Sequence, residues 1–483
     1  MADYSSLPTI RDQLFNKSLS ISNLLEHYLK KTEEYKDLNA FIEIFEKDAI
    51  DHARVIQQKI DNGTPGKLAG MILGLKDNIC YKDHISSASS KSLYNYTSVY
   101  HSTVVQRLLD EDAIIIGRTS CDEFAMGGTN ETSVYGPVLN PIDRRKVPGG
   151  SSGGSAVAVA TGMCLAALGS DTGGSVRQPA SFCGVIGMKP SYGRVSRYGL
   201  IAYGSSFDQI GPITRTIEDA AIILEVISGG DKFDTTASSK VVPSYSDMLR
   251  QAISPAKIAY LQDPLEHKAL DTEIKDKMYE IISRLKDKGH MVDPVDFPLL
   301  DYLVPAYYVM AMAEASSNLA RYDGIHYGHR SQDADDIRST YIRSRSEGFG
   351  LEAKRRIMTG TFVLSTGYYD AYYAKAQKVR RMIADKTKDI FSKYDFILLP
   401  TTPRTAFDLG SMGDDPVALY LEDIFTIHAN LAGIPALSLP LGHHSNGLPF
   451  GIQVMAEGFQ EGELMRFGDY LLKEFKPVEK KHI

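Results

Sequence analysis

One short run of glycine and serine constrains this 483-residue chain more than any other segment. Residues 149–155 read Gly-Gly-Ser-Ser-Gly-Gly-Ser, and small residues follow at once from Ala156 to Cys164. The run is too short and too sharply bounded for a flexible linker, so it predicts a tight turn that feeds a closely packed helix. A second turn of this kind, residues 171–177, places Ser175 24 residues after Ser151. Two hydroxyls on two glycine-rich turns indicate hydroxyl chemistry supported by backbone N–H groups.

Composition limits the classes of function that the chain can have. Its 43% hydrophobic and 23% charged residues are ordinary globular values. The formal net charge of -7 and the lack of a basic tract argue against direct nucleic-acid binding, so we expect a partner to make any RNA contact. The four scattered cysteines have no metal-binding spacing and predict reduced thiols and no metal site. We find no signal peptide and no long apolar run, and therefore expect a cytoplasmic protein without a membrane span.

Hydrophobic periodicity along the chain predicts alternating helices and strands. An apolar helix face begins at Ile21 behind a Ser20 N-cap, and residues 216–227 have the same spacing. Residues 257–295 follow a strand–helix–strand order, which favours a crossover unit with two parallel strands. The two serine-bearing turns are separated by an apolar segment of helical length. The predicted fold is α/β, with a large mixed β-sheet covered by helices on both faces.

Other segments are expected to connect or bound these elements. Residues 191–212 are punctuated by glycine and proline and predict a loop. The polar residues 326–350, with mixed Arg and Asp, predict a surface segment, and the polar stretch from 229 to about 254 is a candidate boundary or insertion. We expect one domain over residues 1–483, with N-terminal helices near 1–65, a catalytic core near 66–230, and the rest of the core with the substrate pocket near 255–483.

A lysine at the end of an apolar segment is the second unusual feature. Residues 68–78 read as a buried strand that terminates at Lys76. Because a buried ammonium is costly, this lysine either reaches solvent at the sheet edge or is held neutral. Burial can depress the pKa of a lysine until it acts as a base, which a serine nucleophile needs. A second serine can relay the proton when the base lies too far from the nucleophile.

Two other uses of the glycine-rich turns fit less well. A phosphate loop needs a lysine after its glycines, and residues 149–155 have none and do not match GxGxxG. The hydrolase elbow G-x-S-x-G is matched literally by residues 149–153, but the charged residues 140–146 stand where it needs a buried strand. A distant histidine could still complete such a triad, so the elbow stays open. A lysine-assisted serine fits better, because N–H groups beside the Gly173–Gly174 pair could stabilise an oxyanion by roughly 3–4 kcal/mol per donor.

Three motifs, taken together and in this order, resemble the amidase signature family. They are residues 74–78, 149–155 and 171–180, and the spacing of the two serines also matches. The resemblance implies that Ser175 is the acyl-forming nucleophile, Ser151 a bridging serine held by a cis peptide, and Lys76 the terminal base. We interpret Asp171 and Arg177 as partners that hold the loop. The implied oxyanion hole consists of the backbone N–H groups of Thr172, Gly173, Gly174 and Ser175.

Further segments resemble one branch of this family, the A subunits of bacterial glutamyl-tRNA(Gln) amidotransferases. These segments are residues 307–308, 314–319, 354–358, 367–373 and 420–426. The resemblance implies that the chain hydrolyses glutamine to release ammonia, binds no cofactor itself and works with the amidotransferase subunits B and C. The B subunit is then expected to bind ATP and Mg, and to use the ammonia to amidate Glu-tRNA(Gln) and, in many relatives, Asp-tRNA(Asn).

Free glutamine carries an α-carboxylate and an α-ammonium, which an arginine and an aspartate would match. The family pattern implies Arg356 for the carboxylate and Asp423 for the ammonium, with Tyr307 nearby. Arg355 is adjacent, and the sequence leaves open which arginine points inward. His428 stands where the family pattern has a proline or a small apolar residue, which leaves open the local shape near Asp423.

Two alternative functions share part of this pattern. A stand-alone amidase acting on another small amide would use the same three residues with a different pocket. A degenerate scaffold protein would need none of them, and the intact Lys76, Ser151 and Ser175 argue against it.

Overall fold

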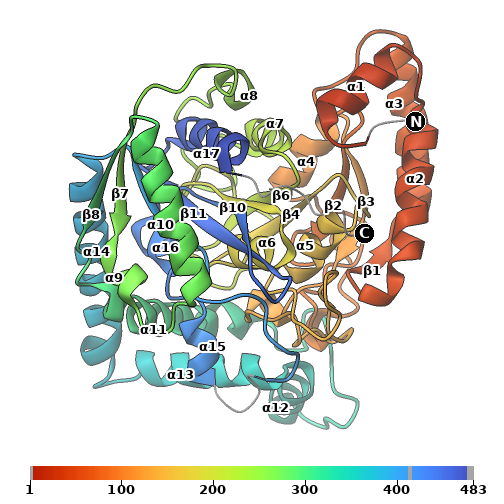
Figure 1. The fold of residues 1–483 in the computed structure, drawn as a ribbon. Helices are drawn as coiled ribbons and strands as arrows, with labels where there is room; N and C mark the ends of the chain where they lie inside the picture. Colours follow the sequence, from red (N-terminus) through yellow and green to blue (C-terminus); the bar gives the residue numbers. More distant parts are fainter. Residues whose placement is uncertain (1–3, 412–415, 476–483) are drawn as a thin grey trace.

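One large β-sheet forms the centre of the molecule in the computed structural model, which describes residues 4–411 and 416–475 (Figure 1). The strand order is β1-β3-β2-β4-β6-β5-β10-β11-β9-β7-β8. β2 runs parallel to β3 and β4, and β7 runs parallel to β8 and β9, whereas the other neighbours are antiparallel. The mixed sheet that the sequence predicts is therefore confirmed. The strands are β1 Phe41–Ile44, β2 Ile72–Lys76, β3 Ile114–Thr119, β4 Ala166–Asp171, β5 Ile186–Lys189, β6 Gln209–Thr214, β7 Lys257–Leu261, β8 Met291–Val295, β9 Phe396–Pro400, β10 Ala436–His443 and β11 Pro449–Ala456.

Helices cover both faces of this sheet. On one face α17 packs against β10, where a Cβ on Gly468 would lie 2.4 Å from Leu437 Cδ2. The next strand residue, Ser438, points to the opposite face, which α6 covers. The helices are α1 Leu7–Phe15, α2 Ile21–Glu34, α3 Glu46–Asp61, α4 Thr103–Asp110, α5 Gly153–Ala160, α6 Arg177–Cys183, α7 Ile217–Ile227, α8 Tyr245–Met248, α9 Gln262–Glu266, α10 Thr272–Asp287, α11 Leu300–Asn318, α12 Ile337–Gly348, α13 Leu351–Leu364, α14 Lys375–Phe391, α15 Pro416–Leu421, α16 Ile427–Ala432 and α17 Glu461–Phe475.

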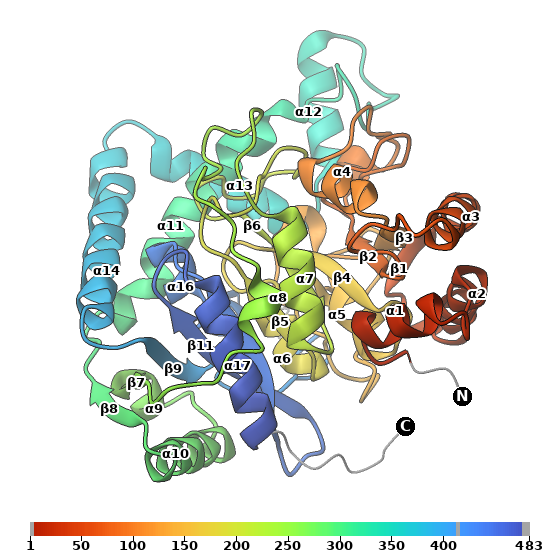
Figure 2. The same cartoon turned by 90° about the horizontal axis from the view of Figure 1, so that it is seen from above.

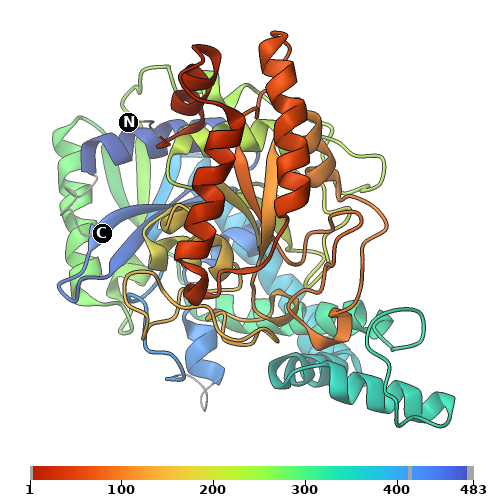
Figure 3. The same cartoon turned by 90° about the vertical axis from the view of Figure 1, so that its right-hand side faces the viewer.

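The N-terminal helices lie at one edge of the sheet, beside β1 and β3 (Figure 2). In Figure 3, α2 and α3 run side by side in red and orange. Ser20 caps α2 as predicted, because its hydroxyl accepts a hydrogen bond from the Asn23 amide at 3.2 Å. The apolar face that begins at Ile21 is buried.

Two central strands are missing from the sequence prediction. The apolar segment between the two serines holds both the short helix α5 and the strand β4, and β6 runs through residues predicted as a loop. β6 contains Gly211 because a Cβ there would lie 2.0 Å from the Met188 carbonyl oxygen. Pro212 sits opposite Leu168 in the antiparallel pair with β4. Glycine and proline at these positions reflect close strand packing, so their usual loop signal is misleading here.

Two other expectations can be compared with the structure directly. β7, α10 and β8 form the predicted strand–helix–strand unit with a parallel pair. The polar segment 326–350 contains α12, whose Asp336 N-cap accepts from the Ser339 amide, so the sequence misses a helix there. Within residues 4–411 and 416–475, no helix is both long and apolar enough to cross a membrane.

Candidate active site

Lys76 is the last residue of β2, and its side chain is entirely buried. Its Nζ donates to Ser151 Oγ at 2.7 Å, to Ser152 Oγ at 2.9 Å and to Ser170 Oγ at 2.9 Å. No carboxylate of the described residues forms an ion pair or hydrogen bond with this nitrogen. Burial among neutral hydroxyls lowers the pKa of Lys76 to about 8. The lysine therefore does not reach solvent, and it lies within proton-transfer distance of Ser151.

The turn before α5 is tight because it packs against Asp122. The peptide bond between Gly150 and Ser151 is cis, and Gly149 has a φ of 82°, which favours glycine. A Cβ on Gly150 would lie 2.1 Å from Asp122 Oδ2. The Asp122 amide donates to the Ser151 carbonyl oxygen at 3.2 Å, and the Gly150 amide donates to Gln178 Oε1 at 2.9 Å. These contacts hold the Ser151 hydroxyl against the lysine.

Ser175 lies on the neighbouring turn, between β4 and α6. The two turns are joined by a hydrogen bond of 3.2 Å from the Ser152 amide to the Ser175 carbonyl oxygen. Ser175 is 8% exposed, whereas Ser151 and Lys76 are 0% exposed, so it is the member of the predicted triad that a substrate can reach. Its hydroxyl makes no hydrogen bond to any described residue. Lys76 and Ser151 are thus in direct contact, and Ser175 stands on an adjoining turn without a hydrogen bond to Ser151.

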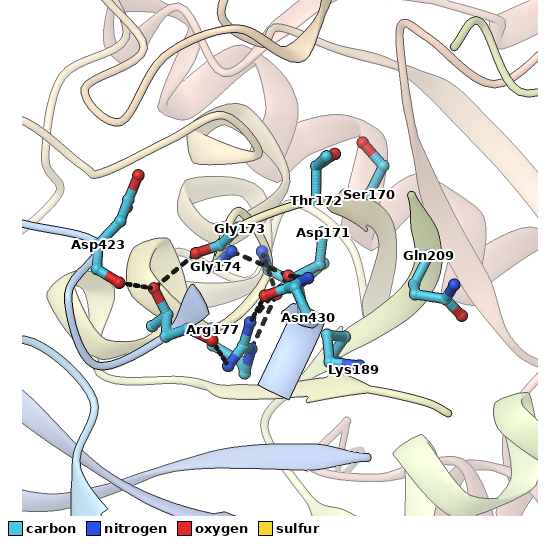
Figure 4. Close-up of polar contacts among 12 residues, drawn as sticks. Ser170, Asp171, Thr172, Gly173, Gly174, Arg177, Lys189, Gln209, Asp423 and Asn430 are labelled. Atoms are coloured by element: carbon cyan, nitrogen blue, oxygen red, sulfur yellow. Dashed lines mark hydrogen bonds and ion pairs between the residues drawn. The ribbon is translucent and has the colours of Figure 1, made fainter. Parts of the chain in front are cut away.

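Asp171 and Arg177 brace the turn that carries Ser175 (Figure 4). Arg177 donates through Nε and one terminal nitrogen to the two Asp171 oxygens, both at 2.9 Å, and both side chains are entirely buried. Burial alone would raise the pKa of Asp171, but the charge and hydrogen bonds of Arg177 outweigh it and lower that pKa to about 2. Asn430 also donates to Asp171 at 2.9 Å, and Arg177 reaches the Thr426 carbonyl oxygen at 2.7 Å. These contacts support the interpretation that Asp171 and Arg177 hold the loop.

The backbone amides of this turn divide into two groups. The Gly174 amide donates to Asp171 Oδ1 at 2.9 Å, so it braces the turn. The amides of Thr172, Gly173 and Ser175 donate to no group in the described part of the chain. A Cβ on Gly173 would lie 2.6 Å from the hydroxyl oxygen of Tyr307, so this tyrosine packs directly on the turn. Three of the four predicted oxyanion-hole amides are therefore available to an oxyanion, while the fourth is engaged.

Arg356 points inward from α13 and is 3% exposed. Its Nε donates to Glu352 Oε1 at 2.8 Å and a terminal nitrogen donates to the Tyr203 hydroxyl at 2.8 Å. The rings of Tyr203, Tyr308 and Tyr420 each lie 5.5 Å from its Cζ, within the range of cation–π attraction. Arg355 has 38% of its side chain exposed and pairs with the outer oxygen of Glu352. The structure thus answers the question that the sequence leaves open: Arg356 is the inward arginine.

Asp423 lies next to this arginine, just after α15. The Tyr308 hydroxyl donates to Asp423 Oδ2 at 2.7 Å, and the same tyrosine ring faces Arg356. Burial raises the pKa of Asp423 to about 7, although the Tyr308 hydrogen bond and the Arg356 charge lower it in part. Tyr307 and Tyr308 are adjacent on α11, and their rings meet edge to face at 4.9 Å. Arg356 and Asp423 therefore lie together among tyrosine side chains next to the Ser175 turn, and we take this cluster as the candidate substrate pocket.

His428 does not disturb this pocket. It lies buried in α16, bonded through Nε2 to Thr387 Oγ1 at 2.8 Å and packed on the Phe297 ring at 4.4 Å. Burial lowers its pKa to about 3, so the side chain is neutral. Among the described residues, it makes no hydrogen bond or ion pair to Asp423. His428 is therefore a core residue and does not change the shape near Asp423.

The predicted site residues omit four polar neighbours of Arg356: Tyr203, Tyr308, Glu352 and Tyr420. Glu352 has a local signal, since it stands four residues before Arg356 and pairs with it on one helix face. Tyr308 follows the predicted Tyr307 directly. Tyr203 lies 153 residues from Arg356, and no spacing in the sequence connects the two.

Known proteins match this chain in sequence and in fold over nearly its whole length. The sequence is 46% identical over 469 residues to the A subunit of glutamyl-tRNA(Gln) amidotransferase from Chlorobium limicola, which covers 97% of this chain and 99% of that protein. The crystal structure of the glutamyl-tRNA(Gln) amidotransferase A subunit from Thermotoga maritima superposes with a TM-score of 0.78 at 41% identity, over 96% of each chain. Peptide amidase from Stenotrophomonas maltophilia superposes with a TM-score of 0.84 at 27% identity, over 99% of this chain and 98% of that one. The family model described as Amidase matches residues 23–465, and the chain therefore belongs to the amidase signature family.

Proposed function

We propose that this chain is the glutamine-hydrolysing A subunit of a tRNA-dependent amidotransferase, with Lys76, Ser151 and Ser175 as its triad. The observation that carries the proposal is the 2.7 Å hydrogen bond between the buried Lys76 Nζ and Ser151 Oγ, beside a pocket that holds both Arg356 and Asp423. Relatives named as the A subunit of glutamyl-tRNA(Gln) amidotransferase match nearly the whole chain and support it.

Proton transfer is the first step. With a pKa of about 8, roughly a tenth of Lys76 is neutral at pH 7, which is enough to act as a base. Neutral Lys76 takes the hydroxyl proton of Ser151, and Ser151 takes the proton of Ser175. The uncharged acceptors around Nζ, three hydroxyls and the Ser170 carbonyl oxygen, support this role, because a carboxylate partner would keep the lysine charged.

The Ser175 oxygen then attacks the side-chain amide carbon of glutamine. The amide oxygen becomes an oxyanion, for which the unengaged N–H groups of Thr172, Gly173 and Ser175 are the available donors. The carbon–nitrogen bond breaks, and ammonia leaves with a proton returned from Lys76 through Ser151. A water molecule, deprotonated by the same relay, hydrolyses the γ-glutamyl ester and yields glutamate and free Ser175.

Substrate recognition belongs to the tyrosine-lined pocket. Arg356 is the candidate partner of the α-carboxylate, because a guanidinium offers two parallel donors to a carboxylate. Asp423 is the candidate partner of the α-ammonium. Tyr307 packs on the turn of Ser175 and separates these charges from the reacting amide. Free glutamine has both charges, whereas a simple aliphatic amide has neither, so this pocket favours an amino-acid amide.

The amidation itself is assigned to partner subunits B and C. In this proposal the B subunit binds ATP and Mg, holds the tRNA and receives the ammonia, and the complex acts on Glu-tRNA(Gln), with Asp-tRNA(Asn) as a second candidate substrate. The net charge of -7 supports tRNA contact through a partner. The absence of a GxxxxGK[ST] pattern at residues 149–155 supports ATP binding elsewhere. A cytoplasmic location is part of the proposal, since tRNA is the final acceptor.

A reconstitution experiment tests this function against the stand-alone amidase. We expect the chain, co-expressed with candidate B and C subunits, to co-purify with them and to support glutamine-dependent amidation of Glu-tRNA(Gln). Omitting the chain should leave amidation that depends on added ammonia. The proposal fails if the chain does not bind the partners and hydrolyses butyramide as efficiently as glutamine, which is the result expected of a stand-alone amidase.

A further inference from the structure

The dipeptide Asp122–Glu123 joins the two halves of the candidate site. On one side, the Asp122 amide donates to the Ser151 carbonyl oxygen at 3.2 Å. On the other side, the Glu123 carboxylate accepts the Gly350 amide at 2.9 Å. Gly350 is the N-cap residue of α13, the helix that carries Arg356. Two consecutive residues therefore span the distance from the turn of Ser151 to the helix of the pocket arginine.

The Glu123 carboxylate satisfies one of the free amides at the start of α13, that of the N-cap residue Gly350. No side chain at the N-cap position satisfies the start of this helix, because that position is a glycine. Glu123 supplies the acceptor from 227 residues away, and it also accepts the Ser90 hydroxyl at 2.6 Å. A carboxylate at a helix N-terminus is favoured by the helix dipole. Glu123 is 5% exposed, so the contact is a buried one and water cannot readily substitute for it.

Glu123 packs closely against the start of α13. A Cβ on Gly350 would lie 2.5 Å from Glu123 Oε2, so a side chain at this position would displace the carboxylate. The neighbouring Phe124 has a φ of 51°, which is the left-handed region, and its ring packs on Phe349 with 5.5 Å between centroids. Backbone in this region persists where the surroundings hold it, and it gathers at functional sites. Glu123 and Phe124 thus both contact the start of α13, the first through its carboxylate and the second through its ring.

We propose that Glu123 is a positioning residue that fixes the distance between the Ser175–Ser151 turns and Arg356, and thereby sets the affinity for glutamine. The inference rests on the proposed function, in which Arg356 binds the α-carboxylate while Ser175 attacks the amide at the other end of the same molecule. An amino-acid substrate of fixed length must satisfy both groups at once, so a small displacement of α13 weakens binding. A substrate without the α-carboxylate does not depend on where α13 stands.

The test compares glutamine with butyramide, which lacks both α-substituents, in the assembled complex. Glu123→Ala leaves the Gly350 amide without its acceptor, and we expect the glutamine KM to rise about tenfold while kcat/KM for butyramide changes less than about twofold. Glu123→Gln keeps an oxygen for the Gly350 amide, and Ser90 can turn its hydroxyl to the Gly348 carbonyl oxygen at 3.4 Å, so KM should stay within about threefold of the parent.

A double-mutant cycle tests the contact itself. Gly350→Ala has an allowed φ of -71° but pushes on the carboxylate, so it should raise the glutamine KM several-fold. In the Glu123→Ala background the added methyl group meets no carboxylate, so the double variant should be no worse than Glu123→Ala alone. Glu273→Ala is the matched control, because this carboxylate also accepts one amide and one hydroxyl, both from Ser445, but on the surface in the first turn of α10. Its KM should equal that of the parent.

Three outcomes separate the possibilities. If the parent complex does not hydrolyse glutamine, the proposed function is wrong, and the role of Glu123 that rests on it is wrong too. If the parent is active and Glu123→Ala has an unchanged glutamine KM, the positioning role of Glu123 is wrong and the proposed function stands. An equal loss toward both substrates, with a lowered melting temperature, also overturns it, because that is the result of a purely structural role.

Discussion

Two buried cations, Lys76 in the proposed triad and Arg356 in the candidate pocket, both lose pKa through burial, but only Arg356 has neighbours that outweigh this effect. Around Lys76 the neighbours are hydroxyls, so burial lowers the pKa of the lysine to about 8 and makes a base available. Around Arg356 the neighbours are Glu352, Asp423 and tyrosine rings, so the cation keeps its charge. One region thus favours proton transfer, and the other keeps a permanent cation beside a carboxyl group whose pKa is about 7.

Two neighbouring groups of buried residues can therefore separate chemistry from recognition. Proton transfer needs a group whose charged and neutral forms are close in energy, and a lysine without an anion satisfies that condition. Recognition of a zwitterion needs opposite charges, which Arg356 supplies at any pH and Asp423 supplies above its pKa of about 7. Changes in the triad should therefore alter the turnover of every amide, whereas changes in the pocket should alter only amino-acid amides.

The largest expected effect is that of Ser175→Ala. Removing the nucleophile should lower glutamine hydrolysis by about 10⁴-fold or more, because the oxygen that forms the acyl-enzyme is missing. In the assembled complex, amidation with added ammonia should continue at the parent rate. Steady-state assays with each nitrogen source measure both. Retention of glutamine-dependent amidation in this variant would contradict the assignment of the nucleophile.

Lys76→Met should follow, with a loss of about 10³-fold in kcat for glutamine and butyramide alike, because the base is missing for both. Lys189→Met is the matched control. Lys189 is also entirely buried, with a pKa lowered to about 7, but its Nζ donates to the Pro190 carbonyl oxygen and to none of the triad serines. We expect the control to retain activity within about tenfold. Equal losses in the two variants would mean that the loss at Lys76 reflects folding, and would contradict its role as the base.

Arg356→Lys should raise the glutamine KM about tenfold to a hundredfold and leave butyramide hydrolysis unchanged, since a lysine cannot form the two parallel hydrogen bonds. Arg355→Lys provides the control, because Arg355 lies at the surface and should show no change. Kinetics with both substrates measure the split. A similar loss for butyramide would show that the pocket and the triad are not separate regions.

The smallest predicted effect is that of Tyr308→Phe, which removes the hydrogen bond to Asp423. That hydrogen bond lowers the pKa of Asp423, so its loss should move the pKa above 7 and leave less carboxylate at neutral pH. The glutamine KM should rise about threefold at pH 7 and remain unchanged at pH 9. A KM increase that is the same at both pH values would exclude this electrostatic cause.

How far the sequence predicts this molecule depends on the kind of signal. Lys76, Ser151 and Ser175 each stand in a short motif that can be recognised within a few consecutive residues. The structure brings Lys76 and Ser151 into contact. β6 is missed because Gly211 is required by a carbonyl oxygen of another strand, which no local pattern reveals. Tyr203 is missed for the same reason, since its contact with Arg356 arises only from tertiary packing.

The inward orientation of Arg356 also needs the structure. Arg355 and Arg356 are identical in sequence terms, and only the packing of α13 on α11 decides which of them is buried. The engaged amide of Gly174 is another case, because its acceptor Asp171 is near in sequence but its geometry depends on Arg177. Residue types can therefore be predicted from motifs, while the direction of each side chain is set by packing.

The most direct test of the central claim is the pH dependence of kcat/KM for glutamine and butyramide in the parent complex. Lys76 acts as a base only when neutral, so butyramide hydrolysis should rise with pH through about 8 and level off above it. Glutamine binding also needs ionised Asp423, so its profile should fall more steeply than that of butyramide below about 7. Identical profiles for the two amides, or a rise centred near the ordinary pKa of lysine at about 10.4, would contradict the account.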